Sequence, residues 1–265
     1  MKSRPTSTAS ASERILAAVS ATRDVAGGVR HDLVIASDLA RVPAILTFPH
    51  ALEPVPAVLV LHGLGSRKER MADSIGMSLM RRGVAALAVD LPLHGERAAS
   101  SHALVDSPRM ITAWSEAVEE AGLALRFLSE HSGVASGRLG LVGYSLGSFL
   151  ANIVAGDAPN VRALVLAASG DLPEGLPFES LVRAVVDPLR AIRRTFGRPL
   201  LMLNGRFDRT VRPSQAERLF AVAPEPKTMR WYGGGHWPPP AEIEYATQWL
   251  ANELRAPSNY AAFRA

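Results

Sequence analysis

Short runs of apolar residues recur along the chain, and longer stretches with apolar positions three or four residues apart lie between them. The short runs predict β-strands, because runs that are apolar at every position are typical of parallel strands covered on both faces. The first two alternate more with polar residues and are joined by a short turn, which predicts an antiparallel hairpin at a sheet edge. The predicted strands are Leu33–Ala36, Ala44–Phe48, Ala57–Leu61, Val84–Val89, Leu139–Val142, Ala163–Ala167, Leu200–Leu203 and Thr228–Trp231.

The stretches between these strands have the periodicity of amphipathic helices. In the first of them Met71, Ile75 and Leu79 fall on one face. Regular alternation of strands and helices predicts an α/β fold, with a mostly parallel, doubly wound sheet flanked by helices. The predicted helices are Ser66–Arg81, Pro108–His131, Gly147–Ala155, Pro213–Val222 and Ala241–Leu254.

Residues 170–198 are longer than a single crossover between two strands needs. A helical apolar stripe runs through them, but Asp187-Pro188 interrupts it. An N-cap aspartate followed by proline predicts that a second short helix begins there. We interpret the segment as a small cap insertion at the carboxyl edge of the sheet, where ligands bind in open α/β folds. The stripe consists of Leu181, Val185, Leu189, Ile192 and Phe196.

We expect one domain over residues 29–255, because a chain of 265 residues suits a single large α/β unit. Residues 1–28 are interpreted as a flexible N-terminal extension, and residues 256–265 as a C-terminal tail. The N-terminal segment lacks the apolar run of a secretory signal, and the chain has no apolar run of roughly eighteen residues. We therefore expect a cytoplasmic protein without membrane contact.

Charge and cysteine content narrow the chemistry. The chain has 29 basic and 25 acidic residues, a formal net charge of +4. The basic residues are scattered among acidic ones, so we expect no nucleic-acid partner. No cysteine is present, which excludes disulfides, thiolate nucleophiles and cysteine-based zinc sites.

Gly143-Tyr144-Ser145-Leu146-Gly147 is a G-x-S-x-G motif. A predicted strand leads into Gly143 and a predicted helix begins at Gly147. Ser145 therefore falls on the tight strand-to-helix turn that lifts a nucleophilic hydroxyl above a sheet. A β-carbon at either glycine would collide with neighbouring backbone. The motif predicts Ser145 as a nucleophile; the alternative is a serine that caps an ordinary helix.

A serine hydroxyl needs a base to become a good nucleophile. His236 lies in the glycine-rich segment Gly233–Pro238, after a predicted strand and before the last predicted helix. We predict His236 as the base. With an aspartate between them in the chain, Ser145 and His236 would follow the order typical of G-x-S-x-G hydrolases.

Two aspartates are candidates for the carboxylate that orients the base. Asp208 follows the strand Leu200–Leu203, at the edge where sites of open α/β sheets are built, and is the predicted acid. Alternatively, it is a turn residue paired with Arg206 or Arg209. Asp187 is the second candidate.

The tetrahedral intermediate of such a reaction needs two donors for its oxyanion. The residue after the nucleophile, Leu146, supplies one backbone N–H. The second is expected from the glycine-containing loop at residues 62–66, and we assign it to Leu64, with Gly65 as the alternative. His62 is interpreted as a buried residue that stabilises this loop rather than as a second base.

These motifs resemble those of the α/β-hydrolase superfamily, over almost all of residues 29–255. The stretch at residues 90–97, Asp-Leu-Pro-Leu-His-Gly-Glu-Arg, is similar to that of dienelactone hydrolase-like and small carboxylesterase branches. The resemblance implies an α/β-hydrolase fold of eight strands, with the second strand antiparallel. The matching positions are His62–Gly65, Asp90–Arg97, Ser145, Asp208 and His236.

The resemblance implies a serine hydrolase that cleaves small to medium-sized carboxylic esters through an acyl intermediate on Ser145. Cleavage of thioesters, amides or carbon–carbon bonds is the nearer alternative, and a non-catalytic ligand-binding relative is the more distant one. No metal-ligand spacing and no phosphate-binding glycine motif occurs, so we expect no metal and no cofactor. The expected partner is a small-molecule ester.

Two groups of polar residues remain. At residues 90–97 we expect a structural network in which His94 or Arg97 holds the loop to a carboxylate. In the insertion, Arg183, Arg190 and Arg194 are either a solvated face or a steering site for an anionic ester. The insertion's apolar stripe is expected to form the wall of the substrate pocket, which favours short acyl groups.

Overall fold

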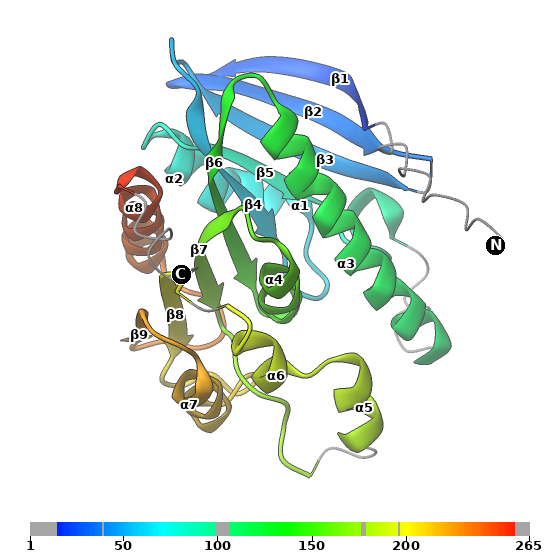
Figure 1. The fold of residues 1–265 in the computed structure, drawn as a ribbon, viewed down its shortest axis with the longest axis vertical. Helices are drawn as coiled ribbons and strands as arrows, with labels where there is room; N and C mark the ends of the chain where they lie inside the picture. The colour runs from blue at the N-terminus through cyan, green and yellow to red at the C-terminus, as the bar shows by residue number, and fades with distance from the viewer. Residues whose placement is uncertain (1–14, 39, 99–106, 176–178, 196, 258–265) are drawn as a thin grey trace, which may run out of the picture.

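The computed structural model describes residues 15–38, 40–98, 107–175, 179–195 and 197–257. Within these residues, nine strands form one sheet in the order β1-β2-β3-β5-β4-β6-β7-β8-β9 (Figure 1). The six strands from β5 to β9 in this order are parallel, and β1, β2 and β3 are antiparallel to their neighbours. The strands are β1 (Leu16–Val25), β2 (Gly28–Ala36), β3 (Arg41–Pro49), β4 (Val55–Leu61), β5 (Ala85–Val89), β6 (Val134–Tyr144), β7 (Val161–Ala167), β8 (Leu200–Gly205) and β9 (Lys227–Tyr232).

The sequence predictions for the sheet are confirmed with one correction. All eight predicted strands form, and β2 and β3 make the predicted antiparallel hairpin. The prediction that residues 1–28 form a flexible extension is wrong for residues 16–25, because they form β1 at the sheet edge and pair with β2. Most side chains of β1 are exposed, so the strand has no apolar pattern, and its main-chain hydrogen bonds hold it in place. Residues 1–14 and 258–265 of the predicted end segments lie outside the described residues.

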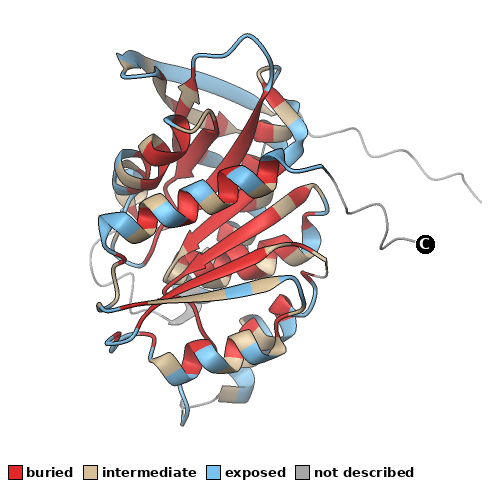
Figure 2. Cartoon of the chain, turned by 90° about the vertical axis from the view of Figure 1, so that its left-hand side faces the viewer, coloured by how far each residue is buried: buried red, intermediate tan, exposed pale blue. Residues whose placement is uncertain are grey.

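Helices cover the sheet in two layers (Figure 1). One layer packs on the core that includes Leu141 and Leu166, and the other on the core that includes Val142 and Val165. Alternate residues of β6 and β7 thus face opposite layers, which explains why the central strands are apolar at every position (Figure 2). The first layer contains α3 (Ser107–Glu130), α4 (Leu146–Asp157), α6 (Pro188–Ile192) and α7 (Pro213–Val222); the second contains α1 (Lys68–Met71), the π-helical turn η1 (Ala72–Gly76), α2 (Met77–Met80) and α8 (Pro240–Arg255).

The insertion contains two short helices, as predicted. They are α5 (Glu179–Val185) and α6, and the Asp187 side chain accepts hydrogen bonds from the Leu189 and Arg190 N–H groups at the start of α6. Phe196, which was predicted to continue the apolar stripe, lies outside the described residues. Of the helices in the described part of the chain, none is long and apolar enough to cross a membrane.

Candidate active site

Ser145 sits on a sharp turn between β6 and α4. Its backbone has φ 51° and ψ −116°, a conformation that is strained for a residue with a side chain. The two glycines of the motif permit this turn. A β-carbon at Gly143 would lie 2.3 Å from the Gly147 oxygen, and one at Gly147 would lie 2.2 Å from the Leu61 oxygen. The glycines are therefore required by close backbone packing, as the sequence predicted.

The structure brings Ser145, His236 and Asp208 together. The Ser145 hydroxyl and His236 Nε2 are 2.8 Å apart, and His236 Nδ1 lies 2.7 Å from Asp208 Oδ2. The other Asp208 oxygen accepts hydrogen bonds from the Thr210 and Val211 N–H groups, at 2.8 and 3.1 Å. A carboxylate can only accept, so Nδ1 of His236 carries the proton and Nε2 is free to accept from the serine. This is the arrangement in which an imidazole can take a hydroxyl proton.

The loops that carry the acid and the histidine are hydrogen-bonded to each other. Arg206 N donates to the Tyr232 oxygen and Phe207 N donates to the Gly234 oxygen, both at 2.9 Å. A β-carbon at Gly205 would lie 2.2 Å from the Gly235 oxygen, so the two loops are in direct backbone contact. These contacts fix the relative positions of two residues that are 28 positions apart.

Aromatic rings support the histidine from one side. The Tyr144 ring lies 5.3 Å from that of His236 and 4.6 Å from that of Trp237, measured between centroids. The Arg70 guanidinium lies 4.0 Å from the centre of the Trp237 ring. Sequence reasoning did not find this stack, although Tyr144 and Trp237 adjoin the predicted nucleophile and base in the chain.

A model of the alpha/beta hydrolase family matches residues 58–250, more than two thirds of the chain. The chain belongs to the alpha/beta hydrolase family. The match spans the elbow at Ser145 and the loops of Asp208 and His236. A search of curated proteins finds no match.

Solved structures share the alpha/beta hydrolase fold with this chain at low sequence identity. A cold-adapted esterase from an Arctic intertidal metagenomic library is 20% identical, with a TM-score of 0.73 over 89% of this chain and 98% of that one. Acetyl xylan esterase 1 from a Thermoanaerobacterium species is 18% identical, with a TM-score of 0.74 over 93% and 90%. The 2,6-dihydroxy-pseudo-oxynicotine hydrolase is 21% identical, with a TM-score of 0.64 over 87% and 69%.

The predicted oxyanion donors flank the serine of this alpha/beta hydrolase. A β-carbon at Gly63 would lie 3.2 Å from the Ser145 β-carbon, so the loop that leads to Leu64 passes directly beside Ser145. Neither the Leu64 N–H nor the Leu146 N–H donates to another described residue. Both N–H groups remain available to a substrate oxygen. That Leu64 and Leu146 are the oxyanion donors stays a prediction.

His62 is fully buried and holds two loops together. Its Nδ1 lies 2.8 Å from the Gly63 oxygen and its Nε2 accepts the Leu91 N–H at 3.0 Å. Burial lowers the pKa of His62 to about 4, so the ring is neutral near pH 7 and Nε2 can accept. The interpretation of His62 as a structural residue is confirmed. Asp187, the second candidate acid, caps α6 and makes no bond to His236.

The loop after β5 is fixed by an ion-pair network around the buried side chains of Lys68 and Asp90. The Lys68 ammonium contacts Asp90 at 3.0 Å and Glu96 at 2.6 Å, and Asp90 also accepts the Lys68 and Glu96 N–H groups. Burial opposes the charge of Lys68, but hydrogen bonds to Glu69, Glu96 and Asp90 raise its pKa above the usual value. Sequence reasoning predicted the network at residues 90–97 but missed Lys68, one of three lysines in the chain.

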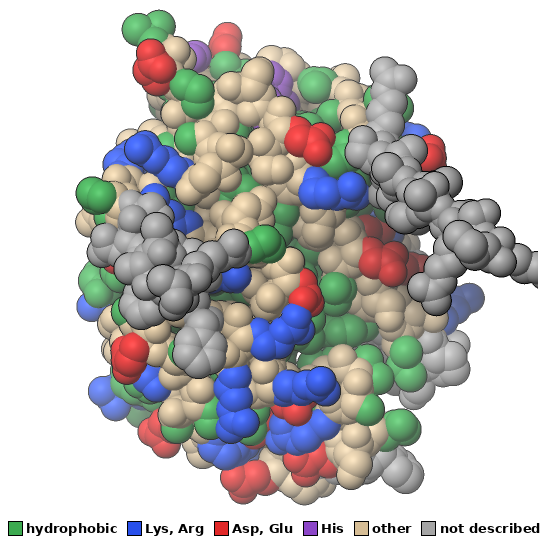
Figure 3. All heavy atoms as spheres, in the orientation of Figure 1, with side chains coloured by type: hydrophobic (Ala, Val, Ile, Leu, Met, Phe, Trp, Pro, Cys, Tyr) green, Lys and Arg blue, Asp and Glu red, His purple; other side chains and the backbone are tan. Residues whose placement is uncertain are grey.

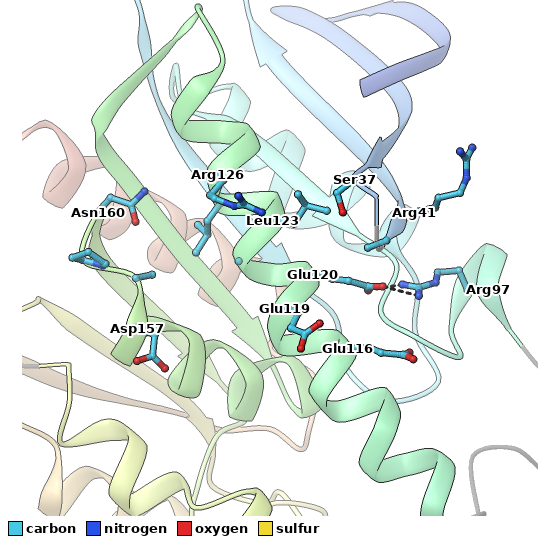
Figure 4. Close-up of a pocket in the computed structure, with 15 residues that line it drawn as sticks. Ser37, Arg41, Arg97, Glu116, Glu119, Glu120, Leu123, Arg126, Asp157 and Asn160 are labelled. Atoms are coloured by element: carbon cyan, nitrogen blue, oxygen red, sulfur yellow. Dashed lines mark hydrogen bonds and ion pairs between the residues drawn. The ribbon is translucent and has the colours of Figure 1, made fainter. Parts of the chain in front are cut away.

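A second ion pair joins this loop to α3. Arg97 donates to both oxygens of Glu120, at 2.6 and 2.8 Å, as Figure 4 shows. This is the predicted contact between Arg97 and a carboxylate. The pair lies at the edge of a cavity of about 900 Å³ along α3, whose lining contains none of the residues Ser145, Asp208 and His236. We therefore do not place the reaction there.

A much smaller apolar cavity is lined in part by Leu146, the residue after Ser145. Its volume is about 30 Å³. The insertion does not line this cavity, because Leu181 and Val185 are exposed and Leu189 packs on the core. That the insertion walls the substrate pocket stays a prediction. The cavity is lined by Leu91, Pro92, Leu93, His94, Ala113, Trp114, Ala117, Leu146 and Leu150, from the loop after β5, α3 and α4.

Basic side chains gather over the lower part of the face shown in Figure 3, where Figure 1 places α6 and α7. Acidic side chains lie among them. Arg183 contacts Asp171 at 2.9 Å, and Arg194 pairs with Asp157. Of the predicted steering group, only Arg190 makes no ion pair with another described residue, which favours a solvated face.

Proposed function

We propose that this alpha/beta hydrolase cleaves carboxylic esters of small to medium size through an acyl-serine intermediate. The observation that carries the proposal is the continuous hydrogen-bonded chain from the Ser145 hydroxyl through His236 to the buried carboxylate of Asp208. Few structural roles need a strained serine, a histidine and a buried aspartate in this order.

In the proposed reaction, His236 Nε2 takes the Ser145 proton as the hydroxyl oxygen attacks the ester carbonyl. The carbonyl oxygen becomes an oxyanion, which the N–H groups of Leu64 and Leu146 stabilise. His236 then gives the proton to the departing alcohol, and the acyl group stays on Ser145. Water, deprotonated by His236, attacks this intermediate, and the bond to the Ser145 oxygen breaks as that oxygen takes the proton back from His236 and the acid is released. Asp208 orients and stabilises the imidazolium.

The similar structures support an ester as the substrate. Two of them are an esterase and an acetyl xylan esterase, and they cover about nine tenths of this chain. Because their identities are 20% and 18%, they support the bond type and leave the acyl and alcohol groups open.

The first test is covalent labelling by a fluorophosphonate together with turnover of a short-chain ester. We expect Ser145→Ala to remove labelling and to lower kcat by about 10⁴ to 10⁶, because no other group supplies the nucleophile. The melting temperature should stay close to that of the wild type. The variant Ser214→Ala, at an exposed serine of α7, is the matched control and should be labelled normally. A wild-type protein that neither hydrolyses an ester nor reacts with the probe would contradict the proposal.

A further inference from the structure

A cleft lies between the segment after β7 and the start of α7. Its volume is about 210 Å³, which is below the roughly 300 Å³ at which pockets for whole small-molecule ligands begin. The cleft therefore suits one polar group of a ligand rather than a whole ligand. Its lining includes Glu174, Arg209, Thr210, Arg212, Ser214 and Arg218.

The lining of the cleft carries an excess of positive charge. Glu174 is the only carboxylate among the described residues that line it, and Arg218 binds Glu174 at 2.6 Å and Asp171 at 3.1 Å. Arg209 and Arg212 are exposed and make no ion pair with a described residue. A guanidinium presents its N–H donors in a planar fork that matches the oxygens of a carboxylate, sulfate or phosphate. The lining of the cleft therefore favours an anionic group.

Many arginines in the described part of the chain pair with carboxylates, as Arg97 and Arg183 do. The turn after β8 differs, because Asp208 is its only acidic residue and both oxygens of that carboxylate are occupied. Oδ1 accepts two backbone N–H groups, and Oδ2 binds His236. The two exposed guanidiniums that follow Asp208 in the chain can therefore bind an anion that this turn does not supply.

The cleft lies at the same edge of the sheet as Ser145. Strands β6, β7 and β8 are adjacent and parallel, so the segments that follow them meet at the carboxyl edge, where ligands bind in α/β sheets. Thr210, which lines the cleft, donates its backbone N–H to Oδ1 of Asp208 at 2.8 Å. Only the Asp208 carboxylate and the His236 ring link this N–H to the Ser145 hydroxyl. A substituent of an ester held at Ser145 can thus extend toward the cleft.

The position of His236 indicates which part of the ester carries the anionic group. The walls of the cleft follow β7 and β8, and His236 follows β9, so all of them lie on the same side of β6 in the strand order. The leaving alcohol must face His236 to receive its proton. The alcohol part of the ester therefore lies on the side of the cleft.

We propose that the guanidiniums of Arg209 and Arg212 bind an anionic group on the alcohol part of the ester. The inference rests on the proposed function and specifies its substrate class as esters whose alcohol carries a carboxylate, sulfate or phosphate. The size of the cleft matches one such group, and its two exposed arginines supply the opposite charge.

The experiment compares 4-acetoxybenzoate with 4-acetoxybenzamide, two acetate esters of similar size whose alcohol parts carry a carboxylate and a neutral amide. The quantity measured is the ratio of kcat/KM for the two esters at low salt, and comparing it between variants cancels their difference in intrinsic reactivity. Arg209→Gln and Arg212→Gln, singly and together, remove the charges of the cleft. Arg138→Gln is the matched control, because it removes an exposed arginine near the opposite end of β6 from Ser145.

We expect the benzoate-to-benzamide ratio to fall about threefold in each single variant and about tenfold in the double variant, because exposed charge pairs contribute modestly. Added sodium chloride should lower the ratio of the wild type and have little effect on that of the double variant. Arg138→Gln should keep the wild-type ratio. An unchanged ratio in the double variant, while both esters are still hydrolysed, would overturn the inference and leave the proposed function standing.

A second measurement does not depend on turnover of either ester. The alcohol product 4-hydroxybenzoate should protect Ser145 from the fluorophosphonate at a concentration about threefold lower than 4-hydroxybenzamide does in the wild type, and at an equal concentration in the double variant. Equal protection by the two compounds in the wild type would overturn the inference. If the wild type neither hydrolyses an ester nor reacts with the fluorophosphonate, the proposed function itself fails.

Discussion

The surroundings of the Asp208 carboxylate leave one of its oxygens for His236. It is 3% exposed, and two backbone N–H groups of its own turn hold Oδ1. Only Oδ2 remains, and His236 binds it. Among the described residues, neither Arg206 nor Arg209 makes an ion pair with Asp208, so the alternative of a surface turn aspartate is not what the structure contains.

A pair of asparagine substitutions distinguishes the two candidate acids. We expect Asp208→Asn to lower kcat by about 10² to 10⁴, because an amide facing Nδ1 favours the wrong tautomer of His236. Asp187→Asn should have little effect, since asparagine is also a good helix N-cap. Ester hydrolysis at saturating substrate gives both values. A larger loss in Asp187→Asn would reverse the assignment.

His62 makes the stability of the protein depend on pH. Its pKa is about 4 in the folded state because of burial, against 6.5 for an exposed imidazole. Between these values the unfolded chain binds a proton that the folded protein does not, so the free energy of unfolding falls as the pH drops from 6.5 to 4. The shift corresponds to about 3 kcal/mol, fully lost below pH 4.

Urea unfolding of the wild type and His62→Gln between pH 7 and 4 measures this contribution. We expect the variant to be less stable at pH 7, because two buried hydrogen bonds are lost, and to show a shallower pH dependence. His50→Gln, at an exposed histidine, should keep the wild-type slope. Parallel pH profiles for wild type and His62→Gln would show that His62 does not titrate in this range.

At the scale of elements, the strands that are buried on both faces could be predicted from the sequence. The central strands are apolar at every position, and the glycines around Ser145 are required by backbone contacts. Both features are therefore visible in the sequence itself. Strand β1 could not, because main-chain pairing with β2 stabilises it and most of its side chains are exposed. Lys68 could not either, since its partners Asp90 and Glu96 are distant in sequence.

Two glycines of β6 give a matched test of the elbow. A β-carbon at Gly143 would lie 2.3 Å from backbone of α4, whereas nothing lies within 4 Å of one at Gly137. We expect Gly143→Ala to lower the free energy of unfolding by at least about 2 kcal/mol, or to prevent folding, because backbone must move. Gly137→Ala should change it little. Denaturant unfolding of both variants checks this, and similar values for the two would contradict the required close packing.

At the scale of the whole molecule, the edge strand β1 lies far across the sheet from the site at the end of β6. Strand β1 lies at one end of the strand order, and four strands stand between it and β6. We expect removal of residues 1–25 to lower the melting temperature by at least ~3 °C, while kcat/KM of the folded fraction stays within about threefold of wild type. The newly exposed edge of β2 should also increase self-association.

Calorimetry, ester hydrolysis and size-exclusion chromatography of the shortened chain measure these effects. A full-length protein from the same preparation is the control. A loss of kcat/KM of more than tenfold in folded, monomeric protein would show that β1 supports the site across the sheet.

The small cavity beside Leu146 could not be predicted from the sequence, because it exists only where the side chains of several elements pack together. Its walls come from the loop after β5, from α3, which follows that loop, and from α4, which follows the next strand β6. The sequence singled out the insertion because it was the longest unassigned segment. Its side chains at Leu181 and Val185 instead face solvent, with 67% and 39% of their surface exposed.

The small cavity and the turns that carry Asp208 and His236 lie on opposite sides of β6, which affects how the sequence of such an enzyme can change. In the proposed reaction, proton transfer depends on the turns after β8 and β9, whereas the small cavity beside Leu146 is built from the loop after β5, α3 and α4. Leu91 and Trp114 line this cavity, so we expect changes there to leave the hydrogen bonds between Ser145, His236 and Asp208 in place. Residues that line the cavity and residues in the turns after β8 and β9 can then be changed independently in the same fold.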